Sequence, residues 1–375
     1  MHNDLAKRLT EARDAYYNGT PIMSDAAFDA LEDQLRALDP THPAILKVGA
    51  AAPSGGAWPK VKHDIPMSSL NKAQTPSEFE DWVQTCKSLP MVGTLKKDGL
   101  SVSLLYKHRK YTQALTRGDG SIGEDITRNV ALMSGVVKML PPTLPDGTVT
   151  PDVVYVRGEI ICKKSDHKTY FPGESNPRNT ASGTAKRQSA GWEKCAHLTV
   201  MTYQLFPNGV VPASKDTELR WLTQMGFNVA PWVSIASFKE AHTWYETYVS
   251  GARATLDFDI DGLVFDINDR SVREALGELN NRPKGSVAWK FPHESKATKL
   301  LDIEWQVGNS GRITPVAIFE PVTLAGASIS RASLAGIRQV EHLKLYKGCN
   351  ILVARRNDCI PRVESNLDLA IENDL

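Results

Sequence analysis

The chain has 375 residues, of which 41% are apolar and 23% are charged, which is ordinary for a protein of two or three domains. This composition excludes collagen-like, coiled-coil and wholly disordered chains. Lys and Arg total 44, Asp and Glu total 43, and the net charge is +1. Charge alone therefore indicates no polyanionic partner, and a nucleic-acid-binding face would have to be a local grouping of basic residues.

The cysteines and the N-terminal sequence indicate in which cellular compartment the protein is expected. The cysteines form no C-x-x-C pair, so the sequence predicts neither a disulfide framework nor a zinc site; they are Cys86, Cys162, Cys195, Cys349 and Cys359. The first residues are polar, and no run of about 18 apolar residues occurs. We therefore expect a cytoplasmic protein without a membrane-spanning segment.

The first 40 residues carry two helical patterns. One apolar stripe ends at Asn18 and Gly19, a typical helix end, and consists of Leu5, Leu9, Ala12 and Tyr16. A second stripe follows Ser24, the expected N-cap, and consists of Phe28, Leu31, Leu35 and Leu38. These patterns predict a helical hairpin. Residues 40–66 are rich in Pro, Gly and Ala, which predicts a linker and a new domain from about residue 60.

The rest of the chain divides into two regions. Between about residues 90 and 290, strand-like segments alternate with helical ones such as residues 236–248, which predicts an α+β body. After residue 292 the pattern becomes almost wholly strand and turn, with strands expected at residues 313–324, 328–331 and 350–355, which suits a small β-barrel. We expect domains at residues 1–60, 61–294 and 295–375.

The first chemical signal is a K-x-D-G pattern formed by Lys96, Asp98 and Gly99 after a predicted strand. Covalent nucleotidyltransferases place their nucleophilic lysine in such a pattern. By itself the pattern is common, and an exposed turn with a solvated lysine is the ordinary interpretation. The order and spacing of the accompanying motifs must therefore decide between a nucleophilic lysine and a solvated one.

A long series of motifs follows in a fixed order: residues 116–125 (TRGDGSIGED), 156–159 (VRGE), 176–179 (NPRN), 260–262 (IDG), 289–292 (WKFP), 306–308 (QVG), 313–316 (ITPV), 355–356 (RR) and 360–361 (IP). With this series the chain resembles the bacterial-type NAD-dependent DNA ligase family, from near residue 5 to near residue 365. The resemblance implies a helical nicotinamide-mononucleotide-binding domain, an α+β adenylation (nucleotidyltransferase) domain and a C-terminal OB-fold barrel.

The resemblance also implies a reaction and its residues. A lysine attacks the α-phosphorus of NAD, releases nicotinamide mononucleotide and keeps AMP, which then activates a 5′-phosphate at a nick in duplex DNA. The implied catalytic residues are Lys96, Asp98, Glu159, Asp261 and Lys290. An amine attacks only when unprotonated, so we expect burial or neighbouring cations to lower the pKa of Lys96. Glu159 and Asp261 are the implied ligands of Mg²⁺ or Mn²⁺.

Further residues are implied in binding the dinucleotide. The positions of the family's arginines and pocket residues that surround AMP correspond to Ser69, Leu70, Thr94, Arg117, Arg178, Tyr203, Arg253 and Asp266, with Tyr203 stacking on the base. In the predicted hairpin, Tyr16, Tyr17, Asp25, Phe28 and Asp29 match the nicotinamide-binding signature, except that Phe28 stands where the family has tyrosine. Aromatic faces and carboxylates suit a cationic pyridinium ring.

Two positions depart from the family in the base pocket. Thr94 stands where the family has Glu, and Asp266 stands where it has Lys. By the resemblance these side chains address the adenine edge, and both polarities are altered. The sequence therefore predicts reduced base discrimination, with guanine as an alternative base. In the other interpretation, Tyr203 stacking and backbone contacts still hold adenine, and Lys97 or a water substitutes at its edge.

The barrel is expected to contact nicked DNA through its basic residues, with Arg331, Arg355 and Arg356 as the implied contacts. The family's zinc finger, helix-hairpin-helix and BRCT domains are not in this sequence, which predicts a minimal ligase, a truncated one or one subunit of a split ligase, of a phage-like or viral-like kind, that serves DNA replication and repair. The alternatives left open are a nucleotidyltransferase that acts on RNA ends or uses another nucleotide, and a subunit without catalytic activity.

Overall fold

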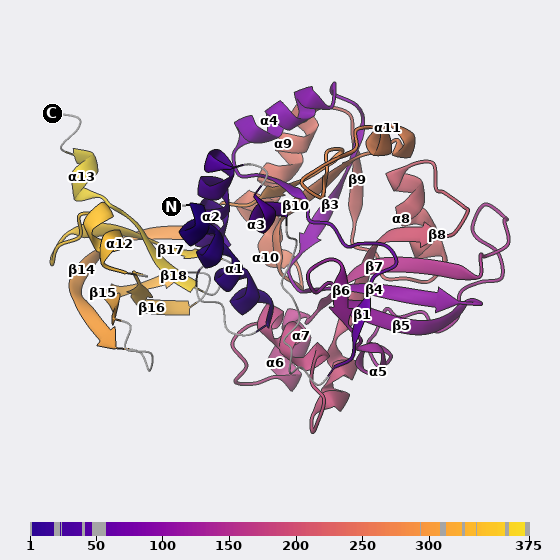
Figure 1. Ribbon diagram of the computed structural model, residues 1–375, viewed down its shortest axis with the longest axis horizontal. Helices are drawn as coiled ribbons and strands as arrows, with labels where there is room; N and C mark the ends of the chain where they lie inside the picture. The colour runs from indigo at the N-terminus through magenta and orange to yellow at the C-terminus, as the bar shows by residue number, and fades with distance from the viewer. Residues whose placement is uncertain are drawn as a thin grey trace. The chain divides into compact units, whose positions relative to one another are not determined.

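The computed structural model describes residues 2–18, 23, 25–39, 42–46, 58–292, 294–307, 313–324, 327–334, 336–356 and 360–371 (Figure 1). Pro43–Phe291 form one compact unit, called the body below. The helices before the body and the strands after it are each described by themselves. None of the described helices is both long enough and apolar enough to cross a membrane.

Two helices occupy the positions predicted at the N-terminus, α1 (His2–Asn18) and α2 (Asp25–Leu38). They pack together through the predicted stripes, since Leu9, Ala12, Leu31 and Leu35 are buried, although Leu38 is 45% exposed. Ser24, the expected N-cap, lies outside the described residues. A short helix, α3 (Pro43–Leu46), lies within the predicted linker because Pro43 suits a first helical turn and Ile45 is buried.

The first sheet of the body has the strand order β2-β13-β10-β3-β9, in which only the pair β2 and β13 is parallel. Its strands are β2 (Asn71–Ala73), β13 (Ser286–Lys290), β10 (Ile260–Ile267), β3 (Met91–Lys97) and β9 (Trp232–Ile235). Helices α4 (Pro76–Thr85) and α9 (Phe238–Thr247) cover one face. There the Trp289 ring stacks on Tyr245 at 3.9 Å and on Phe79 at 4.3 Å between ring centroids, which anchors β13.

The second sheet has the order β5-β4-β7-β8 and is antiparallel throughout. Its strands are β5 (Lys110–Thr116), β4 (Leu100–Lys107), β7 (Val153–Ile161) and β8 (Thr199–Pro207). Val102 and Leu104 point to the buried face, which packs on the helices α5 (Thr127–Val130), α7 (Pro177–Ala185) and α8 (Lys215–Gln224). Because side chains alternate along a strand, Ser101 and Ser103 lie on the opposite face.

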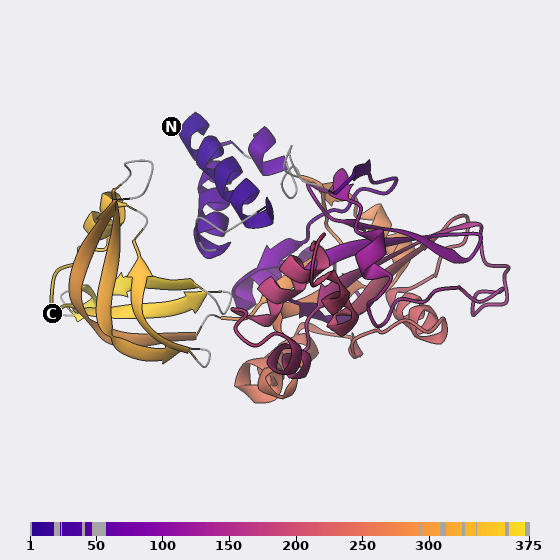
Figure 2. The same cartoon turned by 90° about the horizontal axis from the view of Figure 1, so that it is seen from below.

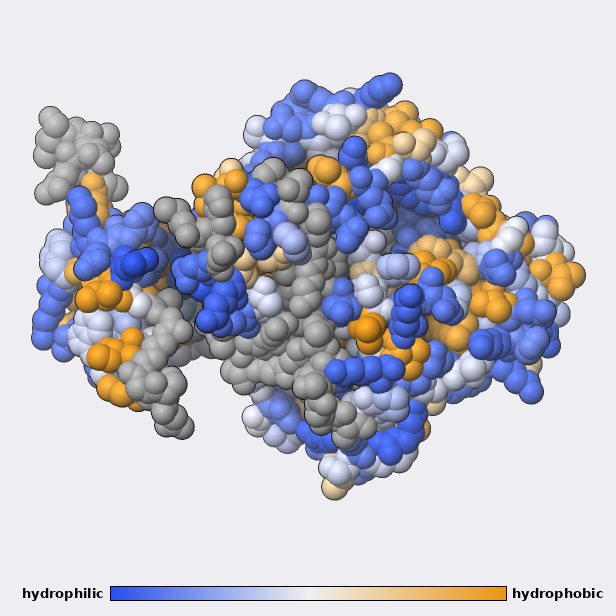
Figure 3. Space-filling view, viewed as in Figure 1, coloured by the Kyte–Doolittle hydropathy of each residue, from blue (hydrophilic) through white to orange (hydrophobic). Residues whose placement is uncertain are grey.

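The remaining elements of the body are short. Strand β1 (Lys60–Lys62) pairs with β6 (Ile122–Glu124), and β11 (Glu278–Leu279) pairs with β12 (Arg282–Pro283). The other helical pieces are α6 (Lys164–Tyr170), η1 (Trp192–His197), η2 (Tyr248–Ala252), α10 (Arg253–Thr255) and α11 (Arg270–Ala275). The surface of the body seen in Figure 3 mixes polar residues with small apolar patches, as its nearly balanced charge leads one to expect.

The strands after the body form one curled five-stranded sheet, β16-β15-β14-β17-β18 (Figure 2). Strand β14 pairs with β17 through its first half and with β15 through its second, so it bends around the core. The predicted strands are confirmed, and a helix that the sequence did not predict, α12, follows β16. The elements are β14 (Glu294–Val307), β15 (Ile313–Leu324), β16 (Ala327–Ser333), α12 (Ile337–His342), β17 (Asn350–Arg356), β18 (Ile360–Asn366) and α13 (Asp368–Ile371).

Candidate active site

The site is built around Lys96, near the end of β3. Its ammonium donates hydrogen bonds to both carboxylate oxygens of Asp261, at 2.8 and 2.7 Å. Asp261 belongs to the neighbouring strand β10, and 165 residues separate the two in sequence. The fold therefore brings together the predicted nucleophile and one of the predicted carboxylates.

A β-bulge directs Asp261 toward Lys96. Ile260 pairs with Lys97 and Gly262 pairs with Lys96, so Asp261 is the extra residue between them. Bulges of this kind re-aim a side chain and are common next to active sites. Gly262 is required beside the bulge because a Cβ there would lie 2.4 Å from the Trp289 carbonyl oxygen.

The pKa of Lys96 departs from the prediction. Burial lowers this pKa, but the carboxylates of Asp261, Asp98 and Glu159 raise it by more, so the net shift is above the ordinary lysine value. The expectation of a lowered pKa is wrong for this arrangement because the neighbouring cations, Lys290 and Arg178, act on Asp261. Lys290 and Arg178 both interact electrostatically with Asp261 and lower the pKa of that carboxyl.

Asp98 and Arg178 form a second ion pair beside the first. The guanidinium of Arg178 lies 3.0 Å from Oδ1 of Asp98. Arg178 is presented by the first turn of α7, whose N-cap Asn176 accepts a hydrogen bond from the Asn179 backbone. Lys290 ends β13, opposite Gly262 of β10. These contacts join the K-x-D-G turn, the NPRN helix and the WKFP segment, residues 289–292, at one place.

Glu159 lies on β7, on the open face of the second sheet. Its Oε2 accepts a 2.8 Å hydrogen bond from the hydroxyl of Ser101, its partner across β4 and β7. Burial raises the pKa of Glu159 to about 7, and the Ser101 hydrogen bond and the charges of Lys96 and Arg117 oppose that rise. Glu159 therefore titrates near neutral pH, which makes its charge adjustable under physiological conditions.

Tyr203 lies on β8, close to Glu159. Burial and the Glu159 carboxylate raise the pKa of the Tyr203 phenol to about 12, so the hydroxyl stays protonated. The ammonium of Lys97 lies over its ring, 5.3 Å from the centroid. Lys215 holds the strand from the other side by donating to the Tyr203 carbonyl at 2.6 Å and by pairing with Glu218 at 3.0 Å.

The other predicted nucleotide-binding residues lie at several points of the body. Arg117, at the end of β5, interacts electrostatically with Glu159 and Tyr203. Arg253 lies 5.5 Å from the Phe291 ring centroid, and the Phe291 backbone donates to the Asp261 carbonyl at 3.1 Å. Ser69 and Leu70 are half-buried and directly precede β2.

Thr94 and Asp266 share the sheet face of Lys96. Thr94 pairs with Val264, and Asp266 pairs with Val92, so both stand farther along the same two strands. The hydroxyl of Ser286 donates to Asp266 at 2.5 Å, whereas the Thr94 hydroxyl lies 3.5 Å from the Val264 carbonyl oxygen. The pair thus presents a carboxylate and a hydroxyl, as the sequence indicates.

The predicted metal ligands were compared with the needs of Mg²⁺. Within the described part of the chain, no group of three or more His, Cys, Asp and Glu side chains is placed to hold a metal ion. Mg²⁺ usually binds through one or two carboxylates together with substrate phosphates. Glu159 and Asp261 fit that pattern only with the substrate, so a metal ion stays a prediction.

Several predicted residues lie outside the body. Tyr16 and Tyr17 are on α1, and Asp25, Phe28 and Asp29 are on α2; of these side chains only that of Phe28 is among the described ones, and it is half-buried. In the curled sheet, Arg331 is 51% exposed in its side chain and pairs with Glu304 at 2.5 Å. The side chains of Arg355 and Arg356, at the end of β17, lie outside the described ones.

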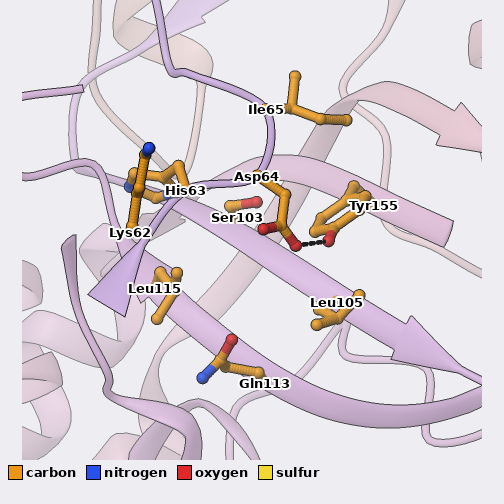
Figure 4. A pocket seen from close by; sticks show the side chains of 9 residues that line it. All are labelled: Lys62, His63, Asp64, Ile65, Ser103, Leu105, Gln113, Leu115 and Tyr155. Atoms are coloured by element: carbon orange, nitrogen blue, oxygen red, sulfur yellow. Dashed lines mark hydrogen bonds between the residues drawn. The ribbon is translucent and has the colours of Figure 1, made fainter. Parts of the chain in front are cut away.

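A small pocket lies on the face of the second sheet that carries Ser101 and Glu159, farther along the strands (Figure 4). Segment 62–65 covers it, and Ser103, Gln113 and Tyr155 line its floor. Tyr155 donates a hydrogen bond to Asp64 within the pocket. Two of its polar side chains are therefore engaged with each other, and none of the predicted site residues lines it.

The sequence did not single out Ser101 and Arg157 as site residues, and it indicated Lys97 only as a substitute at the adenine edge. Ser101 could have been found from strand alternation after the K-x-D-G turn, because residues 101 and 159 are cross-strand partners. Arg157 donates from one guanidinium nitrogen to the carbonyls of Ile65 and Pro66 at 2.9 and 2.7 Å, which fixes the segment leading to Ser69. Such a long-range contact has no signal in the sequence.

Comparison with known proteins agrees with this geometry. Residues 56–294 match the NAD-dependent DNA ligase adenylation domain, and residues 297–373 match the NAD-dependent DNA ligase OB-fold domain. The DNA ligase of Sorangium cellulosum (strain So ce56) is 41% identical over 387 residues, which cover 96% of this chain and 55% of that protein. The DNA ligase of Treponema denticola is 36% identical over 371 residues, which cover 96% and 56%, respectively.

The DNA ligase of Acidiphilium cryptum (strain JF-5) is 35% identical over 377 residues, which cover 96% of this chain and 54% of that protein. The chain thus spans about half the length of these curated relatives. The matched domains together cover the body and the curled sheet, which confirms the predicted fold class of an adenylation domain followed by an OB-fold. The chain belongs to the NAD-dependent DNA ligase family.

Proposed function

We propose that this chain is the core of an NAD-dependent DNA ligase that adenylates itself at Lys96 and seals nicks in duplex DNA. The observation that carries the proposal is the pair Lys96 and Asp261 at the β3 and β10 edge, within a chain of this family. We place the domain limits at residues 1–60, 61–294 and 295–375, and the reaction in the cytoplasm.

The proposed reaction has three steps. The neutral amine of Lys96 attacks the α-phosphorus of NAD, a P–N bond forms, and the P–O bond to nicotinamide mononucleotide breaks. The 5′-phosphate of a nick then attacks the lysine-bound AMP, which frees the lysine and leaves an adenylated end. Finally the 3′-hydroxyl attacks that end and AMP leaves.

The residues of the body divide this work. Asp261 holds Lys96 in place as an ammonium, so Lys96 must lose a proton before it attacks. Asp98 fixes Arg178, which with Lys290 supplies positive charge toward the transferred phosphate. Glu159 holds the ribose, and Tyr203 stacks on the base. Mg²⁺ held by Glu159, Asp261 and the substrate phosphates would neutralise charge on the transferred group.

The parts outside the body complete the proposal. Helices α1 and α2 bind the nicotinamide mononucleotide half of NAD through Tyr16, Tyr17, Asp25, Phe28 and Asp29. The curled sheet contacts nicked DNA with Arg331, Arg355 and Arg356, which suits guanidinium binding to phosphates. A separate chain with further DNA-contacting domains is a possible partner in this scheme.

A mass measurement tests the proposal. Incubation with NAD and Mg²⁺ should add one AMP, about 329 Da, to the intact protein and release nicotinamide mononucleotide. Lys96→Ala should lose this mass shift while its circular dichroism spectrum stays that of the folded protein, because no core side chain is removed. An unmodified protein that gains no mass, or a Lys96→Ala protein that still gains it, would overturn the proposal.

A further inference from the structure

Lys97 is a buried cation for which the proposed reaction has no use. It follows the nucleophile directly, and only 9% of its surface is exposed. Within the described residues its ammonium takes part in no hydrogen bond or ion pair, and it lies over the ring of Tyr203. A buried charge without a hydrogen-bonding partner is costly, so a residue of this kind requires an explanation.

Lys97 is not held in an ion pair within the described part of the chain, although charged groups lie near it. Burial lowers its pKa to about 8, the Glu159 carboxylate opposes that shift, and Lys215 adds to it. Glu159 already accepts a hydrogen bond from Ser101, and Lys215 is paired with Glu218. Within the described residues neither group forms an ion pair with Lys97, so the donors of its ammonium remain available to a ligand.

The position of Lys97 indicates which part of a ligand it meets. The transferred phosphate must lie at Lys96, whose side chain is directed at Asp261. Lys97 is directed instead at Tyr203, and both lysines act electrostatically on Glu159. Because the ammonium lies over one face of the Tyr203 ring, a flat ring that stacks on that same face must lie beside the ammonium, with its edge toward it. Purine bases carry hydrogen-bond acceptors on that edge, as ring nitrogens or a carbonyl oxygen.

We propose that Lys97 is a specificity-determining residue that donates a hydrogen bond to an acceptor atom of the purine base stacked on Tyr203. The inference rests on the proposed function and deepens it. Thr94 and Asp266 present a hydroxyl and a carboxylate on their sheet face. Lys97 supplies the cationic donor that this hydroxyl and carboxylate lack, and so it fixes the base in place of a lysine at position 266.

The test combines a protein variant with altered bases. Self-adenylation is measured with NAD and with three analogues in which N1, N3 or N7 of adenine is replaced by C–H, for the unmodified protein and for Lys97→Met. Methionine keeps the length and removes the donor. A charged hydrogen bond of ordinary strength predicts that Lys97→Met raises KM for NAD by about 10- to 100-fold with kcat little changed.

The analogues identify the contact. One of the three analogues should raise the KM of the unmodified protein by a similar factor. The same analogue should not raise the KM of Lys97→Met any further, because the two changes remove the same hydrogen bond. Lys97→Arg should recover part of the loss. The matched control is Lys239→Met, on the exposed surface of α9, which should leave all four substrates unchanged.

Three outcomes would overturn the inference. One is that none of the analogues raises the KM of the unmodified protein, a result that does not depend on how any variant folds. Another is that the analogues raise the KM of Lys97→Met by the same factors as they raise the KM of the unmodified protein. The third is a fall in kcat with KM unchanged, which would place Lys97 at the phosphate. Failure of the proposed function is distinct, since the unmodified protein would then not react with NAD itself.

Discussion

The carboxylate of Asp261 fixes both the position and the charge of Lys96. Asp261→Asn removes one of the two charged acceptors and most of the attraction that keeps Lys96 protonated. We expect the pKa of Lys96 to fall, and self-adenylation to slow by about 100-fold because orientation is lost. NMR of the lysine ammonium signal against pH measures the first effect, and the rate of AMP transfer measures the second.

Asp259 provides the matched control for this prediction. It lies two residues earlier, and its carboxylate pairs with Lys164 at 3.3 Å rather than with Lys96. Asp259→Asn should therefore leave both the Lys96 titration and the rate of AMP transfer close to those of the unmodified protein. A variant Asp261→Asn with an unchanged Lys96 titration would contradict the role assigned to the ion pair.

Ser101 sets the charge of Glu159. Its hydrogen bond lowers the pKa of Glu159, which burial raises to about 7. In Ser101→Ala the pKa should rise further, so the carboxylate form, present above the pKa, is reached at higher pH. If the carboxylate is the active form, the acid limb of the rate profile moves to higher pH as well.

Carbon-13 NMR of the Glu159 carboxyl and the pH dependence of AMP transfer check this together. Ser103→Ala is the control, since Ser103 is on the same face of β4 but pairs with Arg157 rather than with Glu159. A Ser101→Ala protein whose Glu159 titrates at the same pH as before would show that the hydrogen bond has no influence on the carboxyl.

At the scale of single residues, the sequence singled out Lys96 as the predicted nucleophile but did not indicate the charges around it. The K-x-D-G pattern, the NPRN helix and the IDG strand singled out Lys96, Asp98, Arg178 and Asp261, which lie close together in the structure, while their roles stay predictions. The sequence did not indicate that Asp261 would take both hydrogen bonds of the ammonium, because that depends on one extra residue in a β-bulge. The same applies to Lys97, whose burial depends on the second sheet.

At the scale of elements, the close contact of β10 with β13 depends on Gly262. A Cβ at this position would lie 2.4 Å from the Trp289 carbonyl oxygen and 2.9 Å from the Cα of Lys290. Gly262→Ala should therefore lower the free energy of unfolding by about 1–3 kcal/mol and displace Lys290. Thermal unfolding measures the first effect, and the rate of AMP transfer measures the second.

Gly183→Ala is the control for that substitution. Gly183 lies on the exposed surface of α7, where a Cβ would meet nothing within 4 Å. Alanine should be neutral or stabilising there because it favours a helix over glycine. If both variants unfold at the temperature of the unmodified protein, β10 and β13 tolerate the added carbon and the argument fails.

Helices α1 and α2 are expected to act in one step only. Deletion of residues 1–40 should abolish reaction with NAD but spare sealing of a nick that already carries AMP, because the helices orient only the departing nicotinamide mononucleotide. Both activities can be followed on labelled DNA. Equal loss of the two would show that the helices support the body as a whole.

Element positions were largely predictable from the sequence. Stripes at helical spacing located α1, α2 and α9, and alternating segments located β4, β7 and β10. The short helix α3 was missed because its four residues are too few for a periodic pattern, and its Pro-rich context indicated a linker. Helix α12 was missed for the same reason, since it occupies six residues between strands.

At the scale of the whole molecule, sealing is expected to depend on salt. Contacts between exposed basic residues and phosphates weaken as salt rises, because released counterions no longer favour binding. Nick sealing should fall by at least about tenfold between roughly 50 and 200 mM salt, while self-adenylation, which needs no DNA, should change much less. Measuring both on one preparation provides the control, and salt-independent sealing would contradict the proposed mode of DNA binding.

The ion pair of Lys96 with Asp261 also bears on chemical damage. Aldehydes and acylating metabolites react with neutral amines and not with ammonium groups, so the resting nucleophile is shielded from them. Its neighbour Lys97, with a pKa of about 8, has a larger neutral fraction at physiological pH. Of these two adjacent lysines, the predicted nucleophile is thus the one with the smaller neutral fraction.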